Sequence, residues 1–417
     1  MQDVGQDDVT VIGAGIIGVC CALKLTERGL KVSLIDPEPP CSVTSYGNAG
    51  VISPWSCVPQ SMPGLWKKIP KWLLNPKGPI FIKKSYLLKF LPWAIKFLKA
   101  GELSKVDRIA DAMLNLSKDS VENYRQLLEG TGCHNLVKDS YYVHAYRNEN
   151  SASLQQLSWR LRNERQVPIE LIDSHELQKV EPSLSENFRA AILIKGQGRA
   201  TNPSSIGEAI LKKAISLKVN VIKSKVKSFT PNGEKSYIIH LDNSSHKTKM
   251  IVVAAGVWST KLLEPFGIKI PLEAERGYHL VCNNPGININ NSVMDSDRMC
   301  VASLMEKGVR IAGTAEFAGL NAPPNYERAK VFKSIIKEMF PEVNVSETEE
   351  WMGSRPTLPD SLPCLGEVPS LPGVFSAFGH SHYGLSMAPQ TGRIIADCIT
   401  NRKPDISLEP FKLDRFQ

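Results

Sequence analysis

The sequence predicts an α/β fold with two domains, and three observations carry this prediction. First, 417 residues exceed what a single hydrophobic core usually organises. Second, residues 9–36 read as strand, glycine turn, helix, strand and acid, which is the βαβ unit of a parallel sheet. Third, residues 268–317 read as short strands with polar turns, which is typical of an antiparallel sheet in a second, α+β domain.

The opening unit carries the pattern that binds a dinucleotide. Val9–Ile12 and Lys31–Ile35 are β-rich, and the turn GAGIIG (13–18) joins the first of them to a helical stretch ended by Gly29. The start of a helix offers unpaired N–H groups and a positive dipole end to phosphates. The alternative is an ordinary βα turn that binds no ligand. The strand before the turn, the helix after it and the correctly spaced acid together make that alternative a poor explanation.

The glycines and the acid of this unit each have a physical reason. Gly13 permits the tight turn, Gly15 lets the backbone approach a pyrophosphate, and Gly18 lets helix and strand pack closely. Asp36 follows the second strand and can accept hydrogen bonds from both hydroxyls of an adenosine ribose. An acid here argues against a 2′-phosphate and therefore against NADP. The motif alone does not separate NAD from FAD.

Composition excludes several classes of protein. The nine cysteines form no C-x-x-C pair, which argues against a disulfide framework or a zinc site and fits a reducing compartment. No metal-ligand spacing and no nucleophile elbow is present. The acidic N-terminus predicts no signal peptide, and no stretch reaches 18 uninterrupted apolar residues, so we expect no transmembrane helix.

Residues 60–101 form a lysine- and tryptophan-rich segment inside an interval, between Glu38 and Glu102, without a single Asp or Glu. Such a composition suits a segment lying on a membrane surface. The alternative is a solvated basic face over part of the substrate domain. Nucleic-acid binding is not expected, since no known nucleic-acid module is evident. Pro92 is predicted to serve as the first residue of a helix.

The rest of the chain alternates between helical and strand patterns. The near-continuous apolar run 250–254 predicts a parallel strand buried on both faces, and Asn232-Gly233 predicts a hairpin. Predicted helices are 104–128 as one or two stretches, 154–165, 174–180, 204–218, 326–340 and one from about 389 to 399. Predicted strands are 141–145, 190–194, 219–222, 225–229, 237–241 and 374–377.

Seven short motifs occur once each along the chain. They are VIGAGIIG with Asp36, TSYGNAGVIS (44–53), ATNP (200–203), VVAAGVWS (252–259), ERGYHL (275–280), GSRPTLPD (353–360) and GHSHYGLSMAPQTGRIIAD (379–397). Together they resemble the D-amino-acid oxidase/dehydrogenase superfamily of FAD enzymes over essentially the whole chain. Within it the chain is most similar to the small-subunit type of bacterial D-amino-acid dehydrogenase, which shares the acid-free insertion.

The resemblance implies a discontinuous FAD-binding Rossmann-type domain over residues 1–53, 196–265 and 351–417. A substrate domain with an antiparallel sheet would comprise 54–195 and 266–350. FAD would be bound noncovalently, because Cys364 does not match the attachment position of the covalent branch. The residues that the resemblance assigns to the cofactor are Gly13, Gly15, Ile16, Ile17, Gly18, Asp36, Ser45, Asn48, Ala49, Gly50, Val226, Ala254, Ala255, Gly256, Trp258, Gly353, His380, Gly384, Leu385 and Ser386.

For the substrate, the resemblance assigns carboxylate binding to Arg355, and a planar guanidinium suits bidentate capture. The alternative is a structural arginine paired with Asp360. Tyr278 could hydrogen-bond the substrate or be a core residue. Further candidates near the flavin ring are His279, His382 and Tyr383. The pair Glu275-Arg276 departs from the usual lysine-containing version, with no consequence assigned.

These features together predict a dehydrogenase that transfers a hydride from the α-carbon of a D-amino acid to FAD, with D-proline and hydroxyproline among the candidate substrates. The products would be 2-oxo or imino acids. Electrons would pass to a quinone-type acceptor. The expected location is cytoplasmic, with the inner face of the cell membrane as the site of contact through residues 60–101. The alternative is a soluble oxidase of glycine, sarcosine or another secondary amine that uses oxygen.

Overall fold

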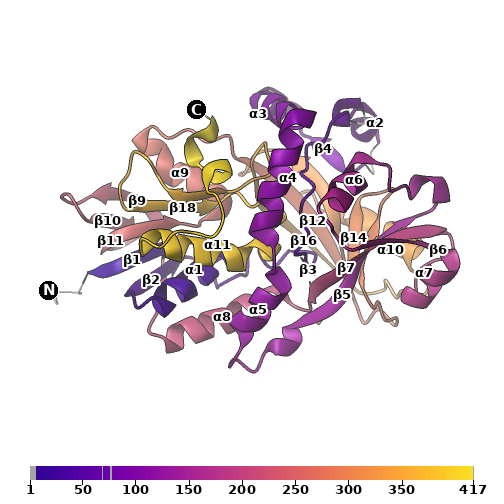
Figure 1. The fold of residues 1–417 in the computed structure, drawn as a ribbon, viewed down its shortest axis with the longest axis horizontal. Coiled ribbons are helices and arrows are strands. Elements are labelled where there is room, and N and C mark those ends of the chain that lie inside the picture. Colours follow the sequence, from indigo (N-terminus) through magenta and orange to yellow (C-terminus); the bar gives the residue numbers. More distant parts are fainter. Residues whose placement is uncertain (1–5, 68, 76–77, 417) are drawn as a thin grey trace.

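The computed structural model describes residues 6–67, 69–75 and 78–416 and contains two sheets, with helices around and between them (Figure 1). The helices are α1 (Ile16–Glu27), α2 (Ile69–Leu74), α3 (Leu87–Ala100), α4 (Leu103–Ser117), α5 (Ser120–Leu128), α6 (Leu157–Glu164), α7 (Ser174–Val180), α8 (Pro203–Ser216), α9 (Ser259–Leu263), α10 (Glu327–Met339) and α11 (Gly384–Ile399). The predicted α/β fold class is confirmed.

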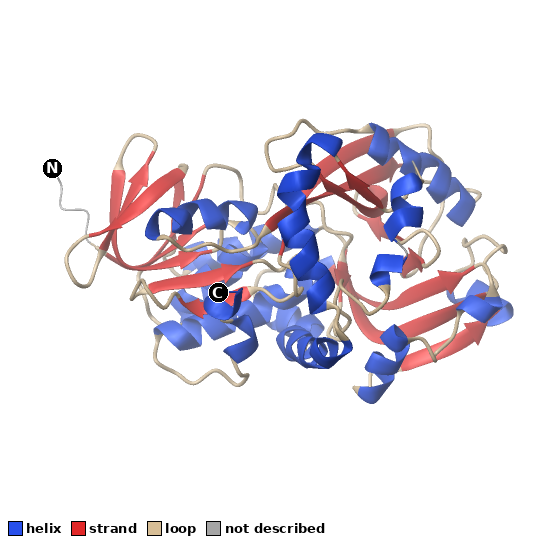
Figure 2. Ribbon diagram, turned by 90° about the horizontal axis from the view of Figure 1, so that it is seen from above, coloured by secondary structure: helices blue, strands red, loops and turns tan. Residues whose placement is uncertain are grey.

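The strands up to residue 253 are β1 (Asp7–Ile12), β2 (Val32–Asp36), β3 (Val51–Ile52), β4 (Ile80–Ile82), β5 (Val137–Tyr146), β6 (Ile169–Asp173), β7 (Ala190–Ala200), β8 (Asn220–Lys223), β9 (Val226–Pro231), β10 (Tyr237–Leu241) and β11 (Ser245–Val253). Those that follow are β12 (Glu273–Asn283), β13 (Ser292–Asp295), β14 (Cys300–Met305), β15 (Gly308–Phe317), β16 (Thr348–Thr357), β17 (Cys364–Glu367) and β18 (Val374–Phe378). Figure 2 shows the two groups of strands toward opposite ends of the molecule.

The first sheet has the order β17-β18-β11-β1-β2-β8, and its neighbours from β18 to β8 are parallel. The hairpin β9–β10 adds antiparallel pairing to the early part of β11. Val11, Leu34 and Val252 are fully buried in the centre of this sheet, because helices cover it. The predicted parallel strand at 250–254 is therefore confirmed, although β11 begins earlier, at Ser245.

Helix α1 packs against α11 and α8 beside this sheet (Figure 1). The approach of α1 to α11 is close because a glycine faces the contact. A Cβ atom at Gly392 would lie 2.7 Å from the backbone oxygen of Cys20. Any other residue at this position would push the two helices apart. The two helices that begin at glycine-rich turns are thereby held side by side.

The second sheet has the order β16-β12-β15-β14-β13-β5-β7-β3, with β4 on β15 and β6 on β7. Its pairs are antiparallel, except that β13 pairs parallel with β5 and β4 parallel with β15. The prediction of short antiparallel strands over 268–317 was wrong in length, since β12 spans 11 residues and β15 spans 10. Strand β16 belongs to this sheet, whereas residues from 351 onward were predicted in the FAD-binding domain.

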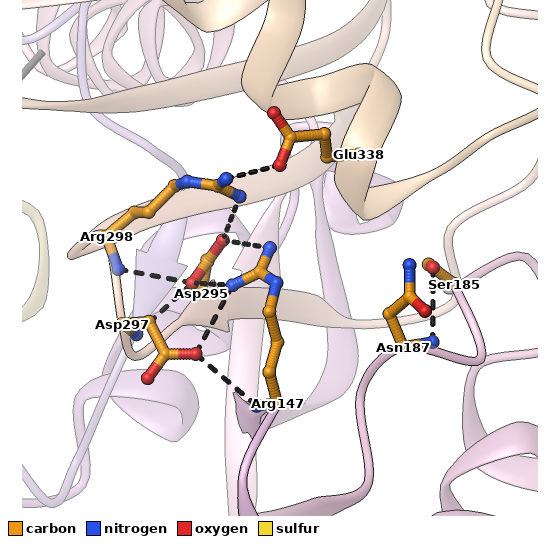
Figure 3. Close-up of polar contacts among 7 residues, drawn as sticks. All are labelled: Arg147, Ser185, Asn187, Asp295, Asp297, Arg298 and Glu338. Carbon is orange, nitrogen blue, oxygen red and sulfur yellow. Dashed lines mark hydrogen bonds and ion pairs between the residues drawn. The ribbon is translucent and has the colours of Figure 1, made fainter.

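An ion cluster around one buried carboxylate joins the second sheet to α10 (Figure 3). Asp295, at the end of β13, is fully buried and accepts hydrogen bonds from both terminal nitrogens of Arg147, at 2.9 and 2.8 Å. Arg298 contacts the same carboxylate and also pairs with Glu338 of α10. A buried carboxylate with two cations is stable only while both remain in place, so the cluster fixes these loops.

Two helices differ from the prediction at a proline. Helix α3 begins at Leu87, so Pro92 lies inside it. The carbonyl of Leu88 loses its N–H partner there, but Leu88 is 84% exposed and water can serve instead. Helix α11 begins at Gly384, five residues before Pro389. In the described part of the chain, no helix is long and apolar enough to cross a membrane.

Candidate active site

The glycine turn after β1 is shaped by contacts that exclude side chains. Gly13 has φ of 107°, and a Cβ there would lie 2.5 Å from the backbone oxygen of Ala254. A Cβ at Gly18 would lie 1.8 Å from the backbone oxygen of Gly13. At Gly15 the nearest atom is the Oγ of Ser45, at 3.4 Å. Gly13 and Gly18 therefore have no space for a side chain, whereas a Cβ at Gly15 would make only an ordinary contact with Ser45.

Polar groups gather at the carboxyl end of β1 and β2. The N–H of Ile16, the first residue of α1, donates to Ser45 Oγ at 3.0 Å, and the N–H of Ala14 donates to Asp36 Oδ2 at 2.7 Å. Burial raises the pKa of Asp36, against the effect of its hydrogen bonds. Ile17 follows Ile16 in the first turn of α1. Helix amides and a carboxylate are the groups that receive a phosphate and a ribose.

The neighbouring strand ends complete this side of the site. The N–H of Ala254 donates to the carbonyl of Ile12 at 2.8 Å, so the segment after β11 lies next to the turn. Ala255 and Gly256 follow, and a Cβ at Gly256 would meet open space. Trp258 is 43% exposed. Val226 begins β9, farther along the same sheet.

The segment 44–53 is held from behind by Arg310. The Nη1 of Arg310 donates to the carbonyl oxygens of Tyr46 and Asn48, at 2.6 and 2.7 Å, and burial lowers the pKa of Arg310 to about 10. Asn48 Oδ1 accepts the N–H of Gly50 at 2.8 Å, with Ala49 between them. Sequence reasoning missed Arg310, because its role depends on the backbone of a segment more than 250 positions away.

The start of α11 is bonded to the same segment. Ser386 Oγ accepts the N–H of Ser53 at 2.9 Å, and the Nδ2 of Asn48 donates to the carbonyl of His382 at 3.4 Å. Gly384 and Leu385 therefore lie beside the 44–53 backbone. The two glycine-rich turns thus converge on one segment.

The neighbouring strands β12 and β16 carry a partly buried ion pair. Arg355 pairs across the strands with Glu275, and its Nη1 donates to Glu275 Oε1 at 2.5 Å and to the carbonyl of Thr314 at 3.0 Å. A Cβ at Gly277 would lie 2.2 Å from Arg355 Nη2, so the guanidinium lies flat on that glycine. In the described part of the chain, Arg355 Nε and Nη2 have no hydrogen-bond acceptor.

His382 and Tyr383 lie next to this pair. Gln60 Nε2 bonds both Glu275 Oε2, at 3.1 Å, and His382 Nδ1, at 3.2 Å. Burial lowers the pKa of His382 to about 4, with a smaller opposing effect of Glu275. The hydroxyl of Tyr383 donates to the carbonyl of Val58 at 2.9 Å, and burial raises the pKa of that hydroxyl.

Trp351 covers the other end of this face. Its ring stacks on His279 with centroids 4.8 Å apart, and burial lowers the pKa of His279 to about 3. Cβ atoms at Gly47 and Gly353 would lie 1.9 and 2.1 Å from the same indole. The two glycines therefore make room for Trp351, which sequence reasoning did not single out. His380 is buried behind the site, where its Nε2 bonds Thr391 Oγ1 at 3.0 Å.

The model of the family described as FAD dependent oxidoreductase matches residues 8–398. The chain belongs to this family. The enzyme is thus an FAD-dependent oxidoreductase, as the sequence predicted.

Individual relatives match this chain over nearly its full length. A D-amino-acid oxidase of Bradyrhizobium diazoefficiens is 35% identical over 415 residues, 98% of each chain. Among solved structures, L-proline dehydrogenase from P. horikoshii matches with a TM-score of 0.77 at 21% identity, covering 99% of this chain and 98% of that one. Glycine oxidase from Bacillus cereus ATCC 14579 matches with a TM-score of 0.74 at 19% identity, covering 98% and 99%. The activity is therefore FAD-dependent amino-acid oxidation. The names of these relatives give different amino-acid substrates.

The residues present fit FAD. Gly15 adds no side chain of its own at the start of α1, and the carboxylate of Asp36 lies where the second strand ends. Ser45 presents a hydroxyl to the same helix start. These groups match the phosphate and ribose of an adenine dinucleotide.

Two expectations about the substrate side need correction. Tyr278 is almost fully buried on the opposite face of β12 from Arg355, because side chains alternate along a strand. Its hydroxyl donates to Glu316 at 2.5 Å and accepts the N–H of Asn325 at 3.0 Å. The core alternative for Tyr278 therefore holds, and a substrate contact does not fit.

The suggested structural partner of Arg355 was also wrong. Asp360 pairs with Arg415, whose Nε donates to it at 2.8 Å. Arg415 also lies within 3.5 Å of the sulfur of Cys364, and burial raises the pKa of that thiol. Arg355 is bonded to Glu275 instead. Within the described ranges, no cluster of three or more histidine, cysteine or acidic side chains could hold a metal ion.

Proposed function

We propose that the enzyme oxidises D-amino acids, with D-proline and hydroxyproline among the candidates, and passes the electrons to a quinone-type acceptor. The observation that carries the substrate assignment is the open Nε/Nη2 edge of Arg355. The side chain of Arg355 is 21% exposed, and its Nη1 is bonded by Glu275 and Thr314. An α-carboxylate can bind such an edge through two parallel hydrogen bonds.

The side chains around Arg355 position the substrate. Noncovalently bound FAD would supply the acceptor for the hydride from the substrate α-carbon. The imino acid from a primary amino acid then hydrolyses to a 2-oxo acid and ammonia, whereas proline-like substrates give a cyclic imine or its ring-opened form without release of ammonia. Arg355 fixes the carboxylate and so limits in which enantiomer the α-hydrogen faces the acceptor. His382 is neutral at physiological pH and receives a hydrogen bond from Gln60 at Nδ1, so its ring proton resides on Nε2.

The decisive experiment is anaerobic reduction of the flavin across a panel of D- and L-amino acids, proline and N-methyl amino acids. Bleaching by D-amino acids, with L-enantiomers inert, is expected. Preferential bleaching by glycine or sarcosine would instead favour the alternative of an oxygen-using oxidase, which the names of the B. diazoefficiens and B. cereus proteins keep open. Peroxide release in air separates the two: the dehydrogenase yields little, and the oxidase one equivalent per turnover.

Helix α3 supports the membrane side of this proposal. Leu88, Leu91, Ile95 and Leu98 recur with spacings of three, four and three, which puts them on one stripe of the helix. All four are exposed, from 39% for Leu98 to 84% for Leu88. On the opposite side, Phe90, Trp93 and Phe97 pack with Phe317 or with one another. The helix is therefore fixed to the protein by one face while a second apolar stripe remains uncovered.

Charge favours an anionic lipid surface as the occupant of this stripe. Lys89, Lys96 and Lys99 are exposed beside it, and no Asp or Glu occurs between residues 38 and 102. A second copy of the chain would bring its own lysines against these, without acids to pair them. Trp93 contributes less than predicted because it is buried, whereas Trp66 is 61% exposed and is available to a lipid surface. A membrane-resident quinone would be reached from this side.

Vesicle sedimentation tests the contact. Ile95→Gln should reduce binding to vesicles with anionic lipid several-fold, since burial of that side chain is lost. Ile215→Gln on α8 is the matched control, because Ile215 and Ile95 are both 47% exposed. Charge reversal at Lys67 and Lys71 should also weaken binding; Lys68, predicted to act with them, lies outside the described residues. Equal sedimentation of all variants would leave only a solvated basic face.

A further inference from the structure

One guanidinium beside the second sheet has no acidic partner. Arg162, near the end of α6, is half-buried and makes no ion pair with any residue that the structure describes. Its Nη1 donates to the carbonyl of Ser158 at 3.0 Å, and its Nε is buried without an acceptor there. Burial lowers the pKa of Arg162, but a guanidinium stays protonated in proteins. A half-buried cation is costly unless acceptor oxygens satisfy it, so Arg162 marks a place for a ligand that has them.

Aromatic side chains surround this guanidinium. The Cζ of Arg162 lies 4.6 Å from the ring centroid of Trp159. His144 meets the same indole edge-on with ring centroids 4.9 Å apart, and the ring of Tyr142 lies 4.5 Å from that of His144. Burial raises the pKa of Tyr142 and lowers that of His144 well below its usual value, so both rings are neutral. We call these four residues the Arg162 cluster, and the guanidinium supplies its charge.

The free polar atoms of the Arg162 cluster can donate hydrogen bonds. Within the described ranges, neither the hydroxyl of Tyr142 nor Arg162 Nη2 has a hydrogen-bond partner. Tyr142, His144 and Arg162 are all half-buried, so each keeps surface that a small molecule can reach. Aromatic rings together with donors that lack acceptors fit a flat ligand that carries carbonyl oxygens.

The Arg162 cluster borders the candidate active site through Tyr383. Burial raises the pKa of the Tyr383 hydroxyl, and among charged groups Arg162 lowers this pKa most while Glu275 raises it. The hydroxyl is therefore within electrostatic reach of both. The rings of Tyr383 and His382 have centroids 3.9 Å apart, and Tyr383 directly precedes Gly384, which the resemblance assigns to FAD. A ligand on the Arg162 cluster would thus lie near the cofactor without occupying the carboxylate site.

The same cluster lies next to the helix that follows α3. Ala110 of α4 packs with Trp159 in one apolar core. Arg165, three residues after Arg162, donates from Nε to Asp111 of α4 at 2.8 Å, so α6 and α4 are fixed side by side (Figure 1). Because α4 follows directly on α3 in the chain, α6 is tied to the helix pair that carries the uncovered apolar stripe.

We propose that the Arg162 cluster binds the quinone-type electron acceptor, with the quinone ring against the aromatic side chains and a carbonyl oxygen on Arg162. The inference deepens the proposed function, on which it rests. The oxygens of a quinone accept hydrogen bonds and match the free donors of Tyr142 and Arg162. By way of FAD the quinone gains two electrons and two protons, and its two C=O groups become C–O–H groups. The amino acid loses the same electrons and protons, from one C–H and one N–H bond, as it becomes an imino acid. Negative charge that develops on the quinone oxygen is stabilised by the guanidinium.

Equilibrium dialysis of the oxidised holoenzyme with duroquinone (tetramethyl-p-benzoquinone) tests the site without turnover. This quinone has no ring hydrogen and therefore does not add to the free cysteines. Arg162→Gln should raise its dissociation constant about tenfold and Tyr142→Phe about threefold, since a charged and a neutral hydrogen bond are lost. Arg160→Gln and Tyr141→Phe are the matched controls, because both residues are exposed neighbours of the same type. Equal affinity in all four variants would overturn the proposal.

Reoxidation of the reduced holoenzyme separates this inference from the proposed function. The flavin is reduced with stoichiometric dithionite, without an amino acid, and is mixed anaerobically with sub-saturating duroquinone. Slower reoxidation in Arg162→Gln than in Arg160→Gln supports the site, even if no amino acid of the panel bleaches the flavin and the substrate assignment fails. Reoxidation at the native rate in every variant keeps the quinone as acceptor and overturns only its place at Arg162. A raised KM for amino acids in Tyr142→Phe, with native affinity for duroquinone, would assign the cluster to the substrate and overturn the proposal as well.

Discussion

The hydroxyl of Tyr124 on α5 donates to the backbone oxygen of Leu385, in the first turn of α11, at 2.7 Å. Leu385 lies four residues before Pro389, so its carbonyl has no helical N–H partner. Tyr124 is fully buried, which keeps water from taking this place. A side chain from a different helix thus replaces the missing backbone bond and lets α11 start where the glycine-rich turn ends.

Tyr124→Phe should therefore destabilise the protein by about 1–2 kcal/mol, because the carbonyl of Leu385 loses the hydroxyl that bonds it. Denaturant unfolding of the FAD-loaded protein measures this change. Tyr141→Phe is the control, since Tyr141 is 38% exposed on β5. The penalty should shrink in a Pro389→Ala background, where residue 389 regains an N–H for Leu385. An identical penalty in both backgrounds would argue against the carbonyl as its cause.

Arg355→Lys should raise KM for amino acids by tens-fold while FAD remains bound. Lysine keeps the charge but offers a single donor group in place of the open Nε/Nη2 edge. Steady-state kinetics and the flavin spectrum together test this. Arg393→Lys, a surface position paired with Asp405, serves as control. Unchanged kinetics in Arg355→Lys would remove the residue from the substrate site.

Asp36→Ala should lower the affinity for FAD by about tenfold or more, since two hydrogen bonds to a charged acceptor would be lost. The fluorescence of flavin released on dilution reports the dissociation constant. Glu38→Ala, two residues further and exposed, should leave the constant unchanged. Retention of FAD in Asp36→Ala at the native level would exclude a ribose contact.

His380 predicts how stability depends on pH. Burial lowers its pKa in the folded protein to about 3, whereas an unfolded histidine titrates near about 6.5. Between these values the unfolded chain binds more protons, so the contribution of His380 is complete above pH of about 6.5 and is lost as pH falls toward about 3. His380→Gln should flatten the loss of unfolding free energy between pH 7 and pH 5. His175→Gln, at an exposed position on α7, should keep the native slope.

Local pattern predicted the first sheet well and the second poorly. A strand buried on both faces and a glycine turn with a following helix leave signals within a few residues, as at Val9–Asp36. The length of β12, the continuation of β7 to Ala200 and the place of β16 depend on neighbours far along the chain. The starts of α3 and α11 were missed because each proline lies where its lost bond can be replaced from outside the helix: Leu88 is exposed to solvent, and Leu385 is bonded by Tyr124.

In the candidate site, too, local motifs were predicted and contacts between distant residues were not. The dinucleotide turn, Asp36 and Arg355 were recognisable from motif and resemblance. The surroundings of Arg355 were not: its partner is Glu275, a residue 80 positions earlier, and Trp351 fills space left by two glycines. Tyr278 was a candidate that only strand alternation, with its hydroxyl on Glu316, assigned to the other face.

The sequence by itself determined that the chain has a βαβ dinucleotide unit and belongs among FAD-dependent amino-acid oxidoreductases, because these signals lie in short, ordered motifs. The tertiary structure decided which edge of Arg355 is free, and that Leu88 and its neighbouring leucines on α3 face outward while Trp93 of the same helix is buried. Both depend on the register of distant strands and on which helix face finds a partner. No local stretch of the chain contains that information, since it arises only when segments far apart pack together.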